Sequence, residues 1–434
     1  MVFNRSLRSL SLAFVMTLVG ENASAQTVTT NVFDTIVPFT YNRGRNESVT
    51  DRLRPDYQAI GIPIGGFTLF PTIGAQAGIS TNVYQSQTNT ISDEFVNFFP
   101  AAKITSNWAV NSLTLEANAH LKRYFAETPR NENAWAAAAT GNFNLDPEKT
   151  LGFTVRTERY YESQFTGIAQ DNLRTPIVAQ ATTAALKGET RMARFLGVLA
   201  GDWTTVNYFS AISRAGAVLN ENDRDRNVAR AVGHAEYGLT PDVGIFVETI
   251  GTFTNYRVPL ANGDANRNST DWRILTGVSL DLASKIRGSI GVGYIQRNYH
   301  APIYIDLSGL ALKAKLEYFP TQLTTVSLAA RREIEDAIFA GTGGYFNTGA
   351  AVRVDHELLR NFLLNIGTDY ELDNYRGISA KATVLKVSGG ADYLVNHLFG
   401  LNIAVNYAHR GSDSALIGPA LHEFRAMIGI TIHR

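Results

Sequence analysis

Cysteine, net charge and long apolar runs are all missing from this 434-residue sequence. The absence of cysteine excludes disulfides, thiolate catalysis and Cys-ligated metals, and is common in proteins that cross an oxidising compartment before folding. The 39 basic and 39 acidic residues balance, so no basic field is available to bind nucleic acid, and no nucleic-acid partner is expected. After residue 25, no stretch approaches the roughly 18 consecutive apolar residues that a transmembrane helix needs. If the mature chain enters a membrane, it has to do so as strands.

The N-terminal segment has the pattern of an export signal. Arg5 and Arg8 form a basic start, and Leu10–Val19 is apolar but too short to span a bilayer. Ala23–Ala25 then forms an A-x-A cleavage site. We therefore expect residues 1–25 to be removed as a signal peptide during export.

Alternation with a two-residue period fills most of the remaining chain. Between residues 113 and 122, leucine and alanine occupy the odd positions, whereas threonine, glutamate, asparagine, histidine and lysine occupy the even ones. The pattern recurs in 151–158, 271–281, 285–294, 312–318 and 362–371. These runs continue for about 10 to 13 residues, which is longer than a typical soluble strand and sufficient for a tilted strand to cross a bilayer. The pattern predicts strands with one face towards lipid and the other towards enclosed water.

Breaks in the alternation give a strand count. Short breaks fall near Trp108, Leu145, Lys187, Thr240, Ser284, Pro320, Arg360 and His397. Longer polar segments lie between them, at 85–94, 126–133, 163–175, 210–227, 257–270, 298–302, 335–344, 374–377 and 411–419. The fold class predicted from these connections is all-β, a transmembrane antiparallel up-and-down β-barrel of about 18 strands over residues 65–434. A barrel of that width leaves an aqueous channel unless something plugs it.

Residues 26–64 precede the first predicted barrel strand. They are polar and lack a sustained apolar period, so they are interpreted as a flexible periplasmic leader. A plug, or a docking arm for a periplasmic partner, is the alternative.

The charged parity of the strands is where function is expected, because those side chains would meet whatever passes through the barrel. Positive and negative charges are interleaved on it, which favours a neutral or mixed solute such as a sugar chain over an anion or cation filter. The alternative is that these charges only pair across strands and stiffen the wall. The predicted pore-lining residues are Glu116, His120, Lys122, Arg156, Glu158, Arg273, Asp281, Lys285, Arg287, Lys313, Lys315, Glu317, Arg331, Glu333, Arg353, Asp355, Glu357, Asp369, Glu371 and Arg425.

Catalytic and metal-binding motifs do not stand out. The sequence has no G-x-S-x-G, H-E-x-x-H or P-loop pattern, so no enzyme activity, cofactor or metal is expected. His120 could act as a base, but a solvated pore-lining imidazole is the preferred interpretation. Asn220–Asp225 offers oxygen ligands for calcium but lacks the glycine and final glutamate of an EF-hand, so an ordinary loop is preferred. Tyr294, Tyr299 and Tyr304 surround one predicted loop and are expected at headgroup depth.

A stretch just before the first predicted barrel strand carries a family resemblance. Arg52–Tyr57 (RLRPDY), followed by Gly61–Pro71 (GIPIGGFTLFP), resembles the opening signature of a family of bacterial outer-membrane barrels called putative beta-barrel porin type 2. The resemblance implies a large barrel in contact with outer-membrane lipid. Members of such families are often associated with exopolysaccharide or capsule export, which implies polysaccharide and periplasmic export components as partners. This association is an analogy of fold rather than of site.

The alternative function is a passive porin for small neutral or sugar-like solutes. A surface adhesin or a barrel enzyme is a more distant alternative. No feature of the sequence indicates an oligomeric state.

Overall fold

The computed structural model describes residues 46–166, 170, 172–260, 263, 265–282, 285–339 and 341–434. The predicted signal peptide and residues 26–45 of the predicted leader lie outside the described residues. Among the described residues, none belongs to a helix that is long and apolar enough to cross a membrane. Helical geometry in the same ranges is limited to four short 3-10 turns: η1 (Pro55–Tyr57), η2 (Thr128–Arg130), η3 (Asn222–Arg224) and η4 (Ala415–Ile417).

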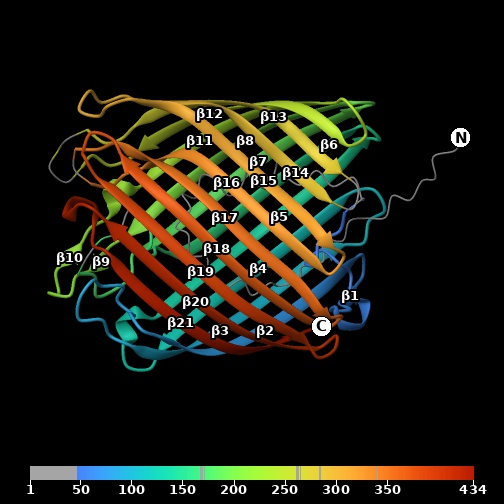
Figure 1. Ribbon diagram of the computed structural model, residues 1–434, viewed down its shortest axis with the longest axis horizontal. Helices are drawn as coiled ribbons and strands as arrows, with labels where there is room; N and C mark the ends of the chain where they lie inside the picture. Colours follow the sequence, from blue (N-terminus) through green and yellow to red (C-terminus); the bar gives the residue numbers. More distant parts are fainter. Residues whose placement is uncertain are drawn as a thin grey trace, which may run out of the picture.

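Eighteen long antiparallel strands form a single closed barrel within the described ranges (Figure 1). Each strand pairs with the next along the chain, and β21 closes the ring on β2, from Thr72 opposite His433 to Ser80 opposite Arg425. The predicted fold class is therefore confirmed. The strands are β2 (Phe67–Ser80), β3 (Asp93–Ser106), β4 (Ser112–Tyr124), β5 (Glu132–Asp146), β6 (Lys149–Tyr161), β7 (Val178–Met192), β8 (Phe195–Phe209), β11 (Arg226–Gly238), β12 (Val243–Tyr256), β13 (Ser269–Leu282), β14 (Ile286–Tyr299), β15 (Leu307–Thr321), β16 (Thr324–Asp336), β17 (Gly344–Leu359), β18 (Phe362–Tyr375), β19 (Lys381–Leu394), β20 (Phe399–Ser412) and β21 (Leu421–His433).

Three short strands lie outside this ring. β1 (Ile62–Ile64) pairs with the start of β2, next to the C-terminal end of the chain. β9 (Ala211–Ile212) and β10 (Val218–Leu219) form a small hairpin in the loop between β8 and β11. We call the end of the barrel near β1 the turn end and the opposite end, with β9 and β10, the loop end (Figure 1). In outer-membrane barrels, short turns face the periplasm and long loops face outwards.

Three predicted turns fall inside strands. Leu145 is the penultimate residue of β5, where the register with β6 shifts between Asn144 and Asp146. Lys187 lies within β7, and the chain reverses instead at Ala193, which has a positive φ of 48° that alanine rarely adopts. Pro320 lies within β15, where the register with β16 shifts between Tyr318 and Thr321. A proline lacks the N–H needed for a regular ladder and is tolerated at such an irregularity. The strands therefore continue past residues, such as glycine and proline, that usually mark the end of a strand.

The apolar parity of the strands forms the outer surface of the barrel. Six large aliphatic side chains on different strands are between 39% and 62% exposed: Leu115, Ile274, Val292, Leu328, Ile366 and Ile428. A continuous surface of this kind is unfavourable in water and suits contact with hydrocarbon.

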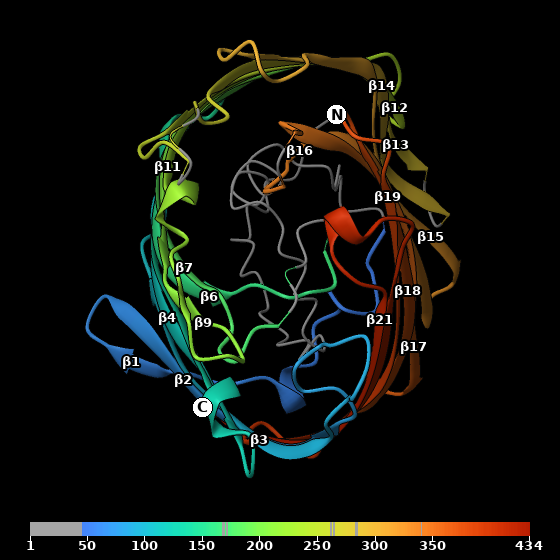
Figure 2. The ribbon, with the colours of Figure 1, turned by 90° about the vertical axis from the view of Figure 1, so that its left-hand side faces the viewer.

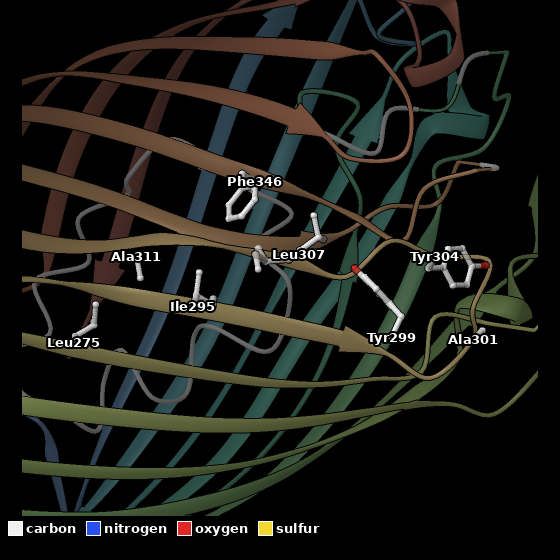
Figure 3. Packing of buried hydrophobic residues seen from close by; sticks show 9 residues of the cluster. Leu275, Ile295, Tyr299, Ala301, Tyr304, Leu307, Ala311 and Phe346 are labelled. Carbon is white, nitrogen blue, oxygen red and sulfur yellow. The ribbon is translucent and has the colours of Figure 1, made fainter.

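The wall departs from a simple cylinder between β15 and β16. Their pairing stops at Leu312 opposite Arg332, although β14 and β15 remain paired as far as Leu307. The tip of β16 lies inside the ring, as seen from the loop end in Figure 2. Its residue Ile334 and Phe346 of β17 therefore pack against side chains of β13–β15, in a cluster with Leu275, Ile295, Tyr299, Ala301, Tyr304, Leu307 and Ala311 (Figure 3).

The assignment of faces predicts a contrast between two neighbouring residues of β17. Val352 is 40% exposed on the outer face, and V352R should lower the free energy of unfolding in lipid vesicles by about 2–4 kcal/mol, because it places a charge in hydrocarbon. A351R changes the adjacent inner-face residue and should cost less than half as much. Reversible denaturant unfolding in vesicles measures both variants. Equal losses for the two, or none for V352R, would contradict the assignment.

Candidate functional site: the barrel lumen

The polar faces of the strands meet on the inner side of the barrel. The antiparallel register places residues of like parity opposite one another, so that Arg287 lies between Asp281 on β13 and Glu317 on β15. All but one of the side chains predicted to line the pore lie in strands β4, β6, β13–β18 and β21. The exception, Lys285, lies in the turn before β14, where its amide donates to the Leu282 carbonyl at 3.2 Å.

Many of these charges have an opposite charge on the same strand, on a neighbouring strand or, for Arg331 and Glu371, on the next strand but one. The pairs are Lys103–Glu116 (3.2 Å), Lys122–Glu132 (3.9 Å), Arg156–Glu158 (2.7 Å), Arg331–Glu371 (2.9 Å), Lys386–Glu371 (3.7 Å), Arg353–Asp355 (2.8 Å), Arg425–Glu423 (2.6 Å) and Arg287–Glu317. Each pair contributes little alone where water reaches it. Together they hold long side chains against the wall.

His120 makes contacts of a structural kind. Its Nε2 lies 3.1 Å from Oδ1 of Asn97, and its ring stacks on Phe99 with 4.6 Å between centroids. The ring is therefore held against the wall by neighbouring side chains, and its role in lining the pore stays a prediction.

Several inner-face charges on β8 and β11–β16 were not among the predicted residues. Arg230 donates to Asp202 at 2.7 Å, whereas Arg297 donates to Asp271 at 2.7 Å and to Asp336 at 2.6 Å. The periodic signal is weak in β11 because the inner face includes Val228 and Val232, while the outer face carries only small residues at Ala229, Ala231, Gly233 and Ala235. The recurrence of Arg226, Arg230, His234 and Glu236 at even positions was the available signal.

A cavity of about 270 Å³ lies against the wall between β11 and β18. Its lining has six basic side chains, at Arg230, Arg273, Arg297, Lys313, Lys315 and Arg331. It also has six acidic side chains, at Glu248, Asp271, Glu333, Glu335, Asp336 and Asp369. The cavity thus brings together part of the predicted set: Arg273, Lys313, Lys315, Arg331, Glu333 and Asp369. The others lie elsewhere on the barrel.

Residues 46–54, which we call the strap, lie along the inner wall at the turn end. The side chain of Asn46 donates to Asp281 at 2.7 Å, and the amide of Val49 donates to Thr325 Oγ1 at 2.9 Å. The strap therefore follows the wall from β13 to β16 and on to β17. The strap is the part of the predicted leader that comes directly before η1 in the sequence.

Arg287 of β14 holds the first part of the strap, because it donates to the Asn46 carbonyl at 3.0 Å and to Asp51 at 2.6 Å. Glu357 of β17 anchors the last part. It accepts hydrogen bonds from Arg52 at 3.0 Å and from Arg54 at 2.7 Å. The side chain of Arg54 is only 1% exposed and that of Glu357 only 5%. Burial lowers the pKa of Arg54, and the charge of Glu357 opposes this effect. Removal of Glu357 would leave a buried cation without its counter-charge.

Residues 162–166, which we call the bridge, cross the lumen at the loop end (Figure 2). Phe165 packs against Val384 of β19 and Leu421 of β21, far round the ring from β6. Arg410 of β20 is fully buried and donates to the Thr166 carbonyl at 2.9 Å. The same guanidinium also donates to the carbonyls of Ile417 and Pro419, both at 2.6 Å.

The start of the bridge is held by Asn220–Asp225, the segment whose oxygen atoms were considered as calcium ligands. Glu162 accepts from Arg224 at 2.5 Å and from the Tyr208 hydroxyl at 3.1 Å, and Glu221 accepts from Arg224 at 3.1 Å. Burial alone would lower the pKa of Arg224, but Glu162, Tyr208 and Glu221 outweigh it and hold the pKa well above its usual value. Asp225 accepts from the Tyr208 amide at 2.6 Å. Carboxylates of this segment are therefore engaged by protein donors.

Comparison with known proteins gives one family and a set of solved barrels. The sequence profile of a family described as Putative beta-barrel porin 2 matches residues 54–434. No curated protein matches the chain. Among solved structures from Pseudomonas aeruginosa, OccK2 (OpdF) is 8% identical, with 84% of this chain and 98% of that chain covered and a TM-score of 0.46. OpdK with vanillate is 9% identical, with 84% and 99% covered and a TM-score of 0.46. OpdO is 11% identical, with 84% and 97% covered and a TM-score of 0.45.

The anchor of the strap predicts a change in accessibility and conductance. E357A should release residues 52–54, the part of the strap that Glu357 binds, so that trypsin cuts the full-length protein after Arg52 and the channel conducts more current. The control is K149A, which breaks an exposed pair with Asp146 at 3.0 Å at the same end of the barrel and should change neither property. Mass spectrometry of the digest and planar-bilayer recordings measure the two effects. Protection of Arg52 in E357A would contradict the role of the anchor.

The bridge yields a separate prediction for the loop end. R410A removes three hydrogen bonds to backbone carbonyls at once, so open-channel current should become larger and noisier while the barrel remains folded. Single-channel recording measures current and noise, and the slower gel migration of the heated protein checks the fold. A folded R410A channel with wild-type current would show that the bridge does not narrow the lumen.

Proposed function

Because this chain belongs to the putative beta-barrel porin 2 family, we propose that it is a passive porin that admits small neutral or sugar-like solutes by diffusion. The family is one of outer-membrane β-barrels, and this chain is an outer-membrane β-barrel of 18 strands. The side chains predicted to line the pore belong to the proposed pathway.

The observation that carries this proposal is the charge balance of the lumenal cavity. Its lining has six basic and six acidic side chains, interleaved on neighbouring strands. A filter for anions would concentrate arginine and lysine, and a filter for cations would concentrate aspartate and glutamate. A balanced wall attracts neither sign of ion strongly and leaves polar groups of both kinds for a solute without net charge.

The occupied lumen favours small solutes over a polymer. The strap takes up part of the turn end, and the bridge crosses the loop end. A polysaccharide on its way out would have to pass both. The family resemblance implies a different function, the export of exopolysaccharide with periplasmic components. This is the alternative hypothesis, and the test below distinguishes it from a passive porin.

Purified protein in planar bilayers and proteoliposomes provides that test. We expect steady conductance without any partner protein, a reversal potential near zero in a KCl gradient, and faster entry of monosaccharides than of trisaccharides. A chain that conducts nothing alone, in a strain that loses surface polysaccharide when the gene is deleted, would contradict the passive porin and favour export. Attachment that is lost on trimming 210–227 while conductance persists would indicate an adhesin.

A further inference from the structure

One row of inner-face residues differs from the paired charges around it. Lys315 lies opposite Ala329, Ala329 opposite Ala351, and Ala351 opposite Asp369, across β15–β18. We call these four residues the alanine row, and all four line the cavity. Its two ends carry opposite charges, about 14 Å apart between Cα atoms because three strand spacings separate them. Because the two alanine side chains are short, they leave space in the lumen between those ends.

Both ends of the alanine row have unused binding capacity. Lys315 is exposed, and its side chain makes neither an ion pair nor a hydrogen bond with the residues that the structure describes. Oδ1 of Asp369 is buried and has no hydrogen-bond partner in the same ranges, whereas the carboxyl group as a whole shares a hydrogen bond with Glu371. By contrast, the nearby Arg331 is bound to Glu371 at 2.9 Å. Lys386 lies opposite Asp369 on β19, and its ammonium is 3.7 Å from Glu371.

The composition of the cavity narrows the class of ligand. A molecule with a single charge would face six side chains of its own sign. Among the described residues that line the cavity, Trp272 is the one aromatic residue, and it shares the parity of Ile274, which is exposed on the outer face. The inner face of the lining therefore offers a sugar no ring to stack on. An unpaired ammonium and a carboxylate with one unbonded oxygen, held apart on one wall, suit a molecule that carries both charges.

We propose that the alanine row binds small zwitterionic solutes, of which α-amino acids are the simplest. The carboxylate accepts hydrogen bonds from the Lys315 ammonium, and the solute ammonium donates to Asp369. This inference rests on the proposed passive porin and narrows its net-neutral solute class. Charge-assisted hydrogen bonds of this kind are among the stronger polar contacts, yet two of them still permit rapid release.

The test uses the mature full-length channel in planar bilayers, with L-alanine as the zwitterionic probe. Glycerol serves as the uncharged probe, propionate lacks the ammonium, and ethylamine lacks the carboxylate. L-alanine should reduce the KCl current at lower concentration than the other three. K315Q and D369N should each raise the concentration for half reduction by about tenfold, since each removes one charged hydrogen bond. K187Q, which changes an inner-face lysine paired with Glu189 outside the cavity, should leave it unchanged.

Exchanging the charges at positions 315 and 369 separates a loss of binding from a loss of folding. K315D alone and D369K alone should both lose the effect of L-alanine, whereas the double variant K315D/D369K should recover it with the solute reversed. A conducting channel that is indifferent to L-alanine overturns the site and leaves the porin function standing. Equal effects of propionate and L-alanine overturn the zwitterionic class in favour of an anion site. A chain without conductance overturns both proposals.

Discussion

The constraint on which the structure depends is that no backbone N–H or C=O can be left unpaired in hydrocarbon. Eighteen strands satisfy it by pairing in chain order and closing β21 on β2. The seam between β15 and β16 is the informative exception, since the ladder stops there before the strands end. The tip of β16 turns inwards at that point, and Arg297 donates to the Ile334 carbonyl at 3.3 Å. The backbone that leaves the ladder is thus held inside the barrel.

Closure of the ring determines the chemistry of the lumen. Alternation sends one half of the side chains to lipid, so the charged half has to find water or counter-charges inside. Where the counter-charge is close, as for Arg297 between Asp271 and Asp336, the side chain is fixed. Where small residues intervene, as at Ala329 and Ala351, the wall is left open and charged groups keep free capacity. The selectivity that we propose for this barrel therefore depends on where alanine interrupts the charged face.

Much of this was accessible from the sequence, because the two-residue period is a local property. The sequence shows directly the two-residue period at 113–122 and the alternation of short and long connections. The number of strands follows from the number of connections. The reversal at Ala193 could not be predicted, since a positive φ at alanine has no residue-type signal. The same is true of Tyr299 and Tyr304, which were expected at headgroup depth but are buried beneath the inward tip of β16. The strap and the bridge depend on contacts between segments hundreds of residues apart, such as Arg54 with Glu357 and Thr166 with Arg410.

The central claim is that adjacent residues of one strand face lipid and enclosed water in turn. Because the chain has no native cysteine, single cysteines can be placed along β17 without background. A charged, water-soluble thiol reagent should label Ala351→Cys and Arg353→Cys and reduce the channel current, while Val352→Cys and Val354→Cys in lipid vesicles should remain unlabelled. Labelling of all four positions, or of none, would contradict the account.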